Sequence, residues 1–248
     1  GMACEGAKPV VAIYSTFLQR GYDQLIHDIV LQDLDILLAI DRAGVVGEDG
    51  STHTGAYDLA FLRCLPKLLV MVPSTAAETR AMLSFGYAHC GPAAVRYPRG
   101  EAFEGGPLAA PIELGRGRLV RSADIANAIA ILNFGALLDK AMVVAQAHNA
   151  TLVDMRFVKP LDELLLQQLL VQHSGFVSIE DHSCIGGAGS AVSEWLVQQK
   201  TQVSLLCLGH EDVALPHGSR EQVLHHTGLS TTAMIAKVEV WKGQLLTE

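Results

Sequence analysis

ILLAIDRAGVVGEDGSTHTG (residues 36–55) joins a short apolar run to a glycine-rich loop. The apolar run, residues 36–40, has the length and composition of a buried strand. The loop after it holds Arg42, Asp49 and His53 among four glycines. Proteins of the α/β class place binding and catalytic groups in the loops that follow parallel strands. This stretch therefore predicts an α/β fold with a candidate site in the loop.

The rest of the chain alternates between short apolar runs and longer segments with helical periodicity. We expect strands at residues 10–14, 36–40, 67–72, 93–97, 129–133, 151–155, 176–180 and 203–208. We expect helices at residues 17–30, 57–64, 75–87, 137–148, 161–173, 189–199, 222–226 and 231–241. The pattern lapses at residues 101–118, where Gly and Pro mark a linker. The alternation predicts two α/β domains of mostly parallel sheet flanked by helices.

The amino-acid composition indicates a protein with buried cores and argues against a nucleic-acid partner. The 248 residues are 50% hydrophobic and 18% charged, which is enough apolar material for buried cores. A net charge of −8 argues against a nucleic-acid partner. A small anionic substrate needs only local positive charge, and the candidates for it are Arg20, Arg42, Arg96 and Arg99.

Cysteine usage and hydropathy favour a cytoplasmic protein without a membrane partner. The five cysteines are scattered and have no CxxC spacing, so neither a disulfide framework nor a zinc site is indicated. No apolar run approaches the roughly 18–20 residues of a membrane span. The first residues lack the basic flank and apolar core of a signal peptide.

The opening loop has two interpretations on residue types alone. Asp49 and His53 suit proton transfer or hydrogen bonds to hydroxyls, and Arg42 suits a phosphate or carboxylate. The same residues also fit a surface turn with its bend at Asp49-Gly50. Arg96 and Arg99 lie at the end of another expected strand, and they fit either an oxyanion site or a solvated turn.

Two neighbouring motifs have weaker functional interpretations. Gly186-Gly187-Ala188-Gly189-Ser190 precedes a helix and could cradle an anion, but it lacks the GxGxxG spacing and the P-loop lysine. Close packing of helix on strand is the better interpretation. Residues 180–184 (EDHSC) are of metal-ligand types, but consecutive residues rarely face one ion. We expect them to be structural or to form a domain contact.

A resemblance to a known family adds to this. The chain resembles the 1-deoxy-D-xylulose-5-phosphate synthase family, a thiamine-diphosphate branch of the transketolase superfamily. The similar segments run in register over nearly the whole chain: AIYSTFLQR (12–20), DQ (23–24), DRAG (41–44), DG (49–50), TH (52–53), LRC (62–64), AVRYPRG (94–100), ILNFG (131–135), VDMRFVKPLD (153–162) and GGAGS (186–190). The resemblance implies a partial pyrimidine-binding domain at residues 1–116 and a transketolase C-terminal domain at 117–248.

The resemblance also implies roles for individual residues. Phe17 would stack on the aminopyrimidine ring of the cofactor, and Tyr14 would line the cofactor and substrate sites. Arg42 and Arg99 would hold the phosphate of glyceraldehyde 3-phosphate. Two further residues would be catalytic: Asp49 by a hydrogen bond to a substrate hydroxyl, and His53 by binding the donor and moving a proton. The family joins this aldehyde to pyruvate, releases CO2 and supplies isoprenoid, thiamine and pyridoxal phosphate synthesis.

Some family features are not found in these residues. The glutamate that activates the cofactor would precede Gly1, and the motif that binds Mg²⁺ and the diphosphate is absent. We therefore expect the thiamine diphosphate and Mg²⁺ sites to be completed outside this chain, and the chain alone to be inactive. The family forms homodimers. Alternatives are a β-type subunit of a two-subunit enzyme (a transketolase half or a 2-oxoacid dehydrogenase) and a non-catalytic oligomerisation module.

Overall fold

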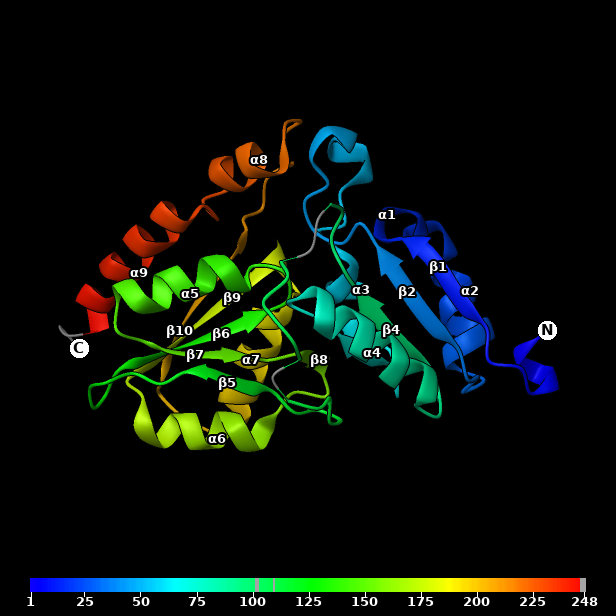
Figure 1. The fold of residues 1–248 in the computed structure, drawn as a ribbon, viewed down its shortest axis with the longest axis horizontal. Helices are drawn as coiled ribbons and strands as arrows, with labels where there is room; N and C mark the ends of the chain where they lie inside the picture. Colours follow the sequence, from blue (N-terminus) through cyan, green and yellow to red (C-terminus); the bar gives the residue numbers. More distant parts are fainter. Residues whose placement is uncertain (101–102, 109, 246–248) are drawn as a thin grey trace.

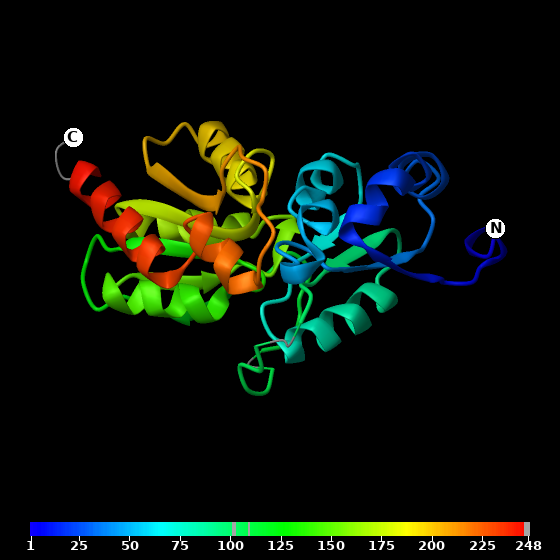
Figure 2. The same ribbon diagram turned by 90° about the horizontal axis from the view of Figure 1, so that it is seen from above.

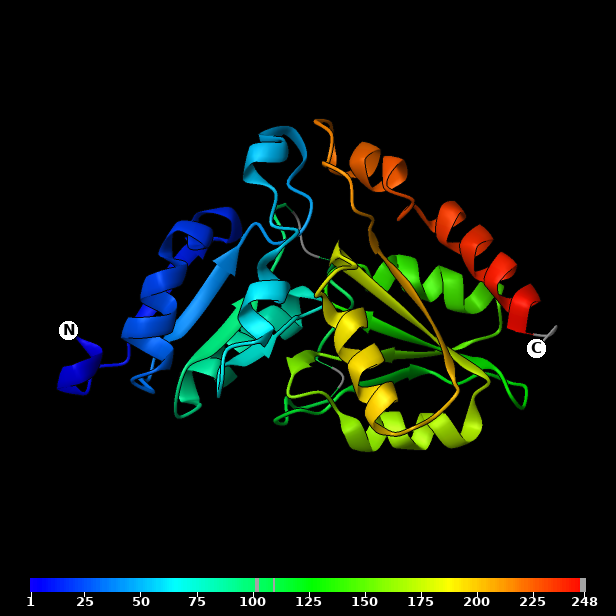
Figure 3. The same ribbon diagram turned by 180° about the vertical axis from the view of Figure 1, so that it is seen from behind.

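The computed structural model describes residues 1–100, 103–108 and 110–245. The chain forms two lobes side by side, each built on a five-stranded sheet, with the termini at opposite ends of the molecule (Figure 1). The two α/β units expected from the alternation are therefore confirmed. A view from behind shows the second sheet between layers of helices (Figure 3).

The first sheet has the strand order β1-β2-β4-β3-β8. Its strands are β1 (Val10–Tyr14), β2 (Leu37–Asp41), β3 (Leu69–Met71), β4 (Ala93–Arg96) and β8 (Phe157–Lys159). The first four are parallel, and β8 pairs antiparallel with β3. Ile40 at the end of β2 is paired with Arg96 at the end of β4. The loops that carry Arg42 and Arg99 therefore leave the sheet at the same edge.

The helices of the first lobe are α1 (Ser15–Leu18), α2 (Tyr22–Gln24), α3 (Asp58–Arg63) and α4 (Ala76–Ala88). The single helix expected at 17–30 is instead a run of short α, 3-10 and π segments over residues 15–30. Thr75 caps α4 by accepting a hydrogen bond from the Glu78 N–H. The hydroxyl of the preceding residue, Ser74, contacts the Glu78 carboxylate instead of capping the helix.

The second sheet has the order β10-β9-β6-β7-β5. Its strands are β5 (Arg118–Arg121), β6 (Ile129–Phe134), β7 (Thr151–Asp154), β9 (Gly175–Ser183) and β10 (Ser204–His210), all parallel except β5. Its helices are α5 (Leu138–Ala147), α6 (Glu163–Gln172), α7 (Ala188–Gln198), α8 (Arg220–His226) and α9 (Thr231–Leu245). One face packs on α5, α8 and α9, and the other on α6 and α7 (Figure 2).

Three features differ from the sequence-based expectation. Strand β5 lies partly within the expected linker, and β8 was not expected. Strand β1 is parallel as expected but is an edge strand rather than a buried one, since Val10 is 51% exposed.

All five cysteines are free. Within the described residues, no helix is long and apolar enough to cross a membrane.

Candidate functional site

The loop between β2 and α3 is closed at its base. Gly44 and Gly55 exchange backbone hydrogen bonds of 2.9 and 2.8 Å. A Cβ at Gly55 would lie 2.3 Å from the Arg42 carbonyl oxygen, so this close approach requires glycine. Arg42 itself has a φ of 57° and turns the chain out of β2. The loop therefore projects from the sheet edge as a compact unit (Figure 1).

Two arginines from different strand ends meet at one carboxylate. Arg42 forms an ion pair with Asp49 Oδ2, and Arg99 Nε lies 3.5 Å from the same oxygen. Arg99 Nη1 also donates to Glu48 Oε2 at 2.8 Å and to the Val46 carbonyl at 3.0 Å. A hydrogen bond from its own backbone N–H, followed by Arg99, lowers the pKa of Glu48. The arginines are thus preorganised by carboxylates from the loop.

An aromatic row continues from the arginine pair. The Arg42 guanidinium lies 4.1 Å from the centroid of the Tyr14 ring, which is stacked on Phe17 at 5.3 Å. Phe17 meets His53 edge to face at 5.6 Å, and it is 47% exposed. The structure therefore brings together all six residues singled out in the sequence, in the order His53, Phe17, Tyr14, Arg42, Asp49 and Arg99.

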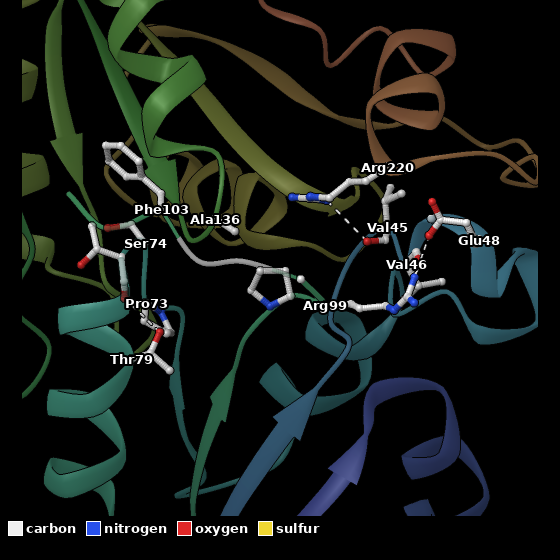
Figure 4. A pocket seen from close by; sticks show the side chains of 14 residues that line it. Val45, Val46, Glu48, Pro73, Ser74, Thr79, Arg99, Phe103, Ala136 and Arg220 are labelled. Carbon is white, nitrogen blue, oxygen red and sulfur yellow. Dashed lines mark hydrogen bonds and ion pairs between the residues drawn. The ribbon is translucent and has the colours of Figure 1, made fainter.

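A cavity of about 480 Å³ lies between the two lobes next to this row. Figure 4 shows Arg99 and Glu48 on the side of the loop, Ser74 and Phe103 opposite them, and Arg220 reaching in from the second lobe. Tyr14, Phe17 and His53 do not line the cavity. It therefore adjoins only the Arg99 end of the row.

The other two arginines considered as anion ligands are not in this row. Arg96 is 6% exposed, and its Nε donates to the buried Asp58 at 2.9 Å. Arg96 is therefore part of neither an oxyanion site nor a solvated turn, because its guanidinium group forms a buried ion pair. Asp58 lies three residues after Gly55, and nothing else in the sequence indicated that it would pair with Arg96. Arg20 is exposed and forms no ion pair with a described residue.

The glycine motif before α7 is occupied by a side chain of the protein. Glu180 accepts hydrogen bonds from the N–H groups of Ala188 and Gly189 at 2.6 and 2.8 Å. A Cβ at Gly187 would lie 2.3 Å from the Glu180 carboxylate, so glycine permits this contact. Burial raises the pKa of Glu180 to about 7 despite these two donors. The packing interpretation of the motif is confirmed.

The two residues after Glu180, Asp181 and His182, form a contact between the two domains, as expected. Asp181 and His182 are buried and accept hydrogen bonds from Val45 and Leu59 of the first lobe. Burial lowers the pKa of His182 to about 4, which suits its role as a neutral acceptor. Among the described residues, no group of three or more His, Cys, Asp or Glu side chains is placed to hold a metal ion.

Comparison with protein families gives two matches. The transketolase pyrimidine-binding domain matches residues 1–103, and the transketolase C-terminal domain matches residues 117–234. The chain is 52% identical over 244 residues to a 1-deoxy-D-xylulose-5-phosphate synthase of Pseudomonas syringae pv. syringae, and 52% identical over 248 residues to one of Pseudomonas putida. These alignments cover 96% and 99% of the chain. The chain spans 38% and 39% of the length of these relatives.

Comparison with solved structures also finds transketolases. The fold matches an inactive β4 tetramer of a split-gene transketolase with a TM-score of 0.87 and 28% identity, covering 96% of this chain and 78% of that one. It also matches a Campylobacter jejuni transketolase (TM-score 0.71, 16% identity, 94% of this chain and 35% of that one), which supports the fold alone. The chain belongs to the transketolase family and carries its pyrimidine-binding and C-terminal domains.

Proposed function

We propose that this chain supplies the acceptor-substrate side of a thiamine-diphosphate-dependent transferase. The reaction joins pyruvate to glyceraldehyde 3-phosphate and gives 1-deoxy-D-xylulose 5-phosphate and CO2. The observation that carries the proposal is the convergence of Arg42 and Arg99 on Asp49 beside an exposed aromatic ring. Identity of 52% to relatives named for this reaction supports it.

The two arginines form the proposed phosphate site. Guanidinium groups bind phosphate oxygens in pairs, and two of them from separate strand ends fix its position. Asp49 keeps them in place when no phosphate is present. On binding, the phosphate would compete with Asp49 for both arginines. The carboxylate would then be free to accept a hydrogen bond from a substrate hydroxyl.

His53 is the proposed proton carrier. Its Nδ1 contacts Thr52 Oγ1 at 3.0 Å, and its Nε2 has no hydrogen-bond partner among the described residues. When the new carbon–carbon bond forms, the aldehyde oxygen of the acceptor becomes a hydroxyl and needs a proton. Nε2 would deliver it, because an imidazole nitrogen without another partner can act as a general acid toward an oxygen within hydrogen-bond reach.

Phe17 and Tyr14 are the proposed contacts to thiamine diphosphate. The exposed Phe17 ring offers a flat face to a heteroaromatic ring. Bound thiamine diphosphate would supply the electron sink for decarboxylation. The diphosphate and Mg²⁺ would be held by a domain outside these residues, with the boundary between the present domains at residues 116/117. We further propose a homodimer in a cytoplasmic setting.

Titration of inorganic phosphate tests the proposed site. We expect the wild-type chain to bind phosphate, and Arg42→Gln and Arg99→Gln each to weaken binding about tenfold, as for loss of one charge-assisted contact. Arg63→Gln is the control, because Arg63 is paired with Glu194, away from the loop. Equal affinity in all four proteins, measured by NMR shift changes, would reject the site.

A second candidate is a β-type subunit of a two-subunit transketolase. The observation that favours it is the likeness to the split-gene transketolase β4 tetramer. The two candidates differ in the donor, which is pyruvate for the synthase and a ketose phosphate for transketolase. Donor preference of the complete enzyme separates them.

A further inference from the structure

The loop that carries the candidate site is held at both ends by the second lobe. Ser183 N–H donates to the Ala56 carbonyl at 2.9 Å, and His182 Nε2 accepts from Leu59 N–H at 3.0 Å. Both contacts come from the end of β9 and hold the chain where the loop returns toward α3. Similar contacts hold the start of the loop.

Asp181 is at the centre of the contacts to the start of the loop. Its carboxylate is 3% exposed and accepts from Val45 N–H at 3.0 Å, His210 Nε2 at 2.9 Å and Arg220 Nη1 at 2.6 Å. A Cβ at Gly44 would lie 2.4 Å from this carboxylate, so the loop backbone is pressed against it. Although burial opposes ionisation, Arg220 and His210 hold the pKa of Asp181 well below its usual range.

Arg220 and His217 extend these contacts along the loop. Arg220 Nη1 also donates to the Val45 carbonyl at 3.4 Å, so one guanidinium joins Asp181 to the loop backbone. His217 Nε2 donates to the Glu48 carbonyl at 3.0 Å, next to Asp49. A Cβ at Gly50 would lie 2.9 Å from the His217 ring. The second lobe therefore supports the backbone of the loop from Gly44 to Gly50.

We propose that Asp181 and Arg220 are positioning residues that hold the loop so that Arg42, Asp49 and Arg99 share one geometry. This inference rests on the proposed function of those three residues. Neither Asp181 nor Arg220 forms a hydrogen bond or ion pair with Arg42 or Arg99. They act through the backbone of Val45, three residues from Arg42. A binding site of this kind requires its ligand groups to be held within about half an ångström.

Two variants and a matched control test the proposal. Arg220→Gln removes the ion pair at a partly exposed position, and Asp181→Asn removes the charge while keeping the shape. Arg63→Gln is the control, because Arg63 also joins the lobes through an ion pair, with Glu194, but contacts no loop backbone. The first readout is hydrogen exchange at the amides of Gly44, Val45 and Gly55, which reports local opening without requiring activity. The second is affinity for inorganic phosphate.

We expect Arg220→Gln to speed exchange at these amides and weaken phosphate binding, each about tenfold, with little change in Tm. Arg220→Lys keeps the charge and one donor and should recover part of both effects. Unchanged loop exchange in Arg220→Gln would overturn the proposal, as would equal acceleration in Arg63→Gln. If Asp181→Asn does not fold, the arginine variants still decide. If the wild-type chain binds no phosphate, the proposed function fails, while the exchange data still judge the positioning role.

Discussion

At the residue scale, the position of Asp49 has a direct consequence for anion binding. Its carboxylate lies between Arg42 and Arg99, where it partly neutralises both guanidinium groups. An incoming phosphate must displace this internal partner or share the arginines with it. At the proposed phosphate site, Asp49 would therefore lower phosphate affinity while it preserves the geometry of the two arginines.

Asp49→Asn should raise the affinity for inorganic phosphate about fivefold, the effect of roughly 1 kcal/mol for a partly exposed ion pair. The amide retains the shape of the side chain but releases the two positive charges. Under the proposed function, turnover of the complete enzyme should fall, since the proposed acceptor for the substrate hydroxyl loses its charge. Isothermal titration against wild type gives the affinity, and unchanged or weaker binding would show that Asp49 does not compete with phosphate.

Sequence reasoning grouped these residues correctly because each follows a strand end or lies in the loop after one. The direction of a side chain was harder to predict. Arg96 and Arg99 are three residues apart, yet Arg96 points into the protein toward Asp58. Asp181 and Arg220 were not recognised as supports of the loop, because they lie more than 120 residues after it and only the tertiary fold brings them near.

At the scale of elements, the N-terminus of α4 and the end of β7 meet at a buried serine that lies between two carboxyl groups. Ser74 Oγ lies 2.7 Å from Glu78 Oε2 and 2.5 Å from Asp154 Oδ2. A hydroxyl has one hydrogen to donate, so the second contact needs a proton on a carboxyl group. Burial, followed by the charge of Glu78, raises the pKa of Asp154 to about 7. Of the two carboxyl groups, Asp154 therefore takes up a proton more readily, even though Arg118 Nη2 lies 3.0 Å from its Oδ2.

This raised pKa predicts how stability depends on pH. The stabilising contribution is complete below the unfolded pKa of Asp154, near 4, and is lost as pH rises through about 7. The Tm of wild type should therefore fall relative to that of Asp154→Asn between pH 5 and pH 8, since the variant lacks this term while the contributions of Glu180 and His182 are common to both proteins. Scanning calorimetry across this range is the measurement. A variant with the full wild-type slope would mean that Asp154 is ionised throughout.

Elements with their own hydrophobic period were predictable, and those defined by their partners were not. All the strands expected from apolar runs are present, with shifts of at most three residues at their ends. Strand β8 has only three residues and forms by pairing with β3 of the other lobe. Strand β5 begins directly after a glycine-rich stretch, and it was not predicted because that stretch was interpreted as a linker. The segment 15–30 kept its helical winding but not a single hydrogen-bond pattern.

At the scale of the whole molecule, the two lobes are connected by a shared strand and by a shared apolar cluster as well as by the linker. Strand β8 comes from the second half of the chain and completes the first sheet. Phe157 in β8 is fully buried in the first lobe against Leu69, Met71 and other residues of that core. The largest apolar cluster also runs from Leu38 in the first sheet to Leu132 in the second. This shared strand and shared apolar cluster join the two lobes beneath the loop that both of them contact.

The most direct test of the account is steady-state kinetics of a complete enzyme. This chain would replace the matching part of the Pseudomonas putida synthase, with thiamine diphosphate and Mg²⁺ supplied and folding checked by Tm. We predict product from pyruvate and glyceraldehyde 3-phosphate. Arg42→Gln and Arg99→Gln should each raise KM for the aldehyde about tenfold, with KM for pyruvate and the Arg63→Gln control within about twofold. A folded enzyme that uses a ketose phosphate instead of pyruvate, or arginine variants with unchanged KM for the aldehyde, would contradict it.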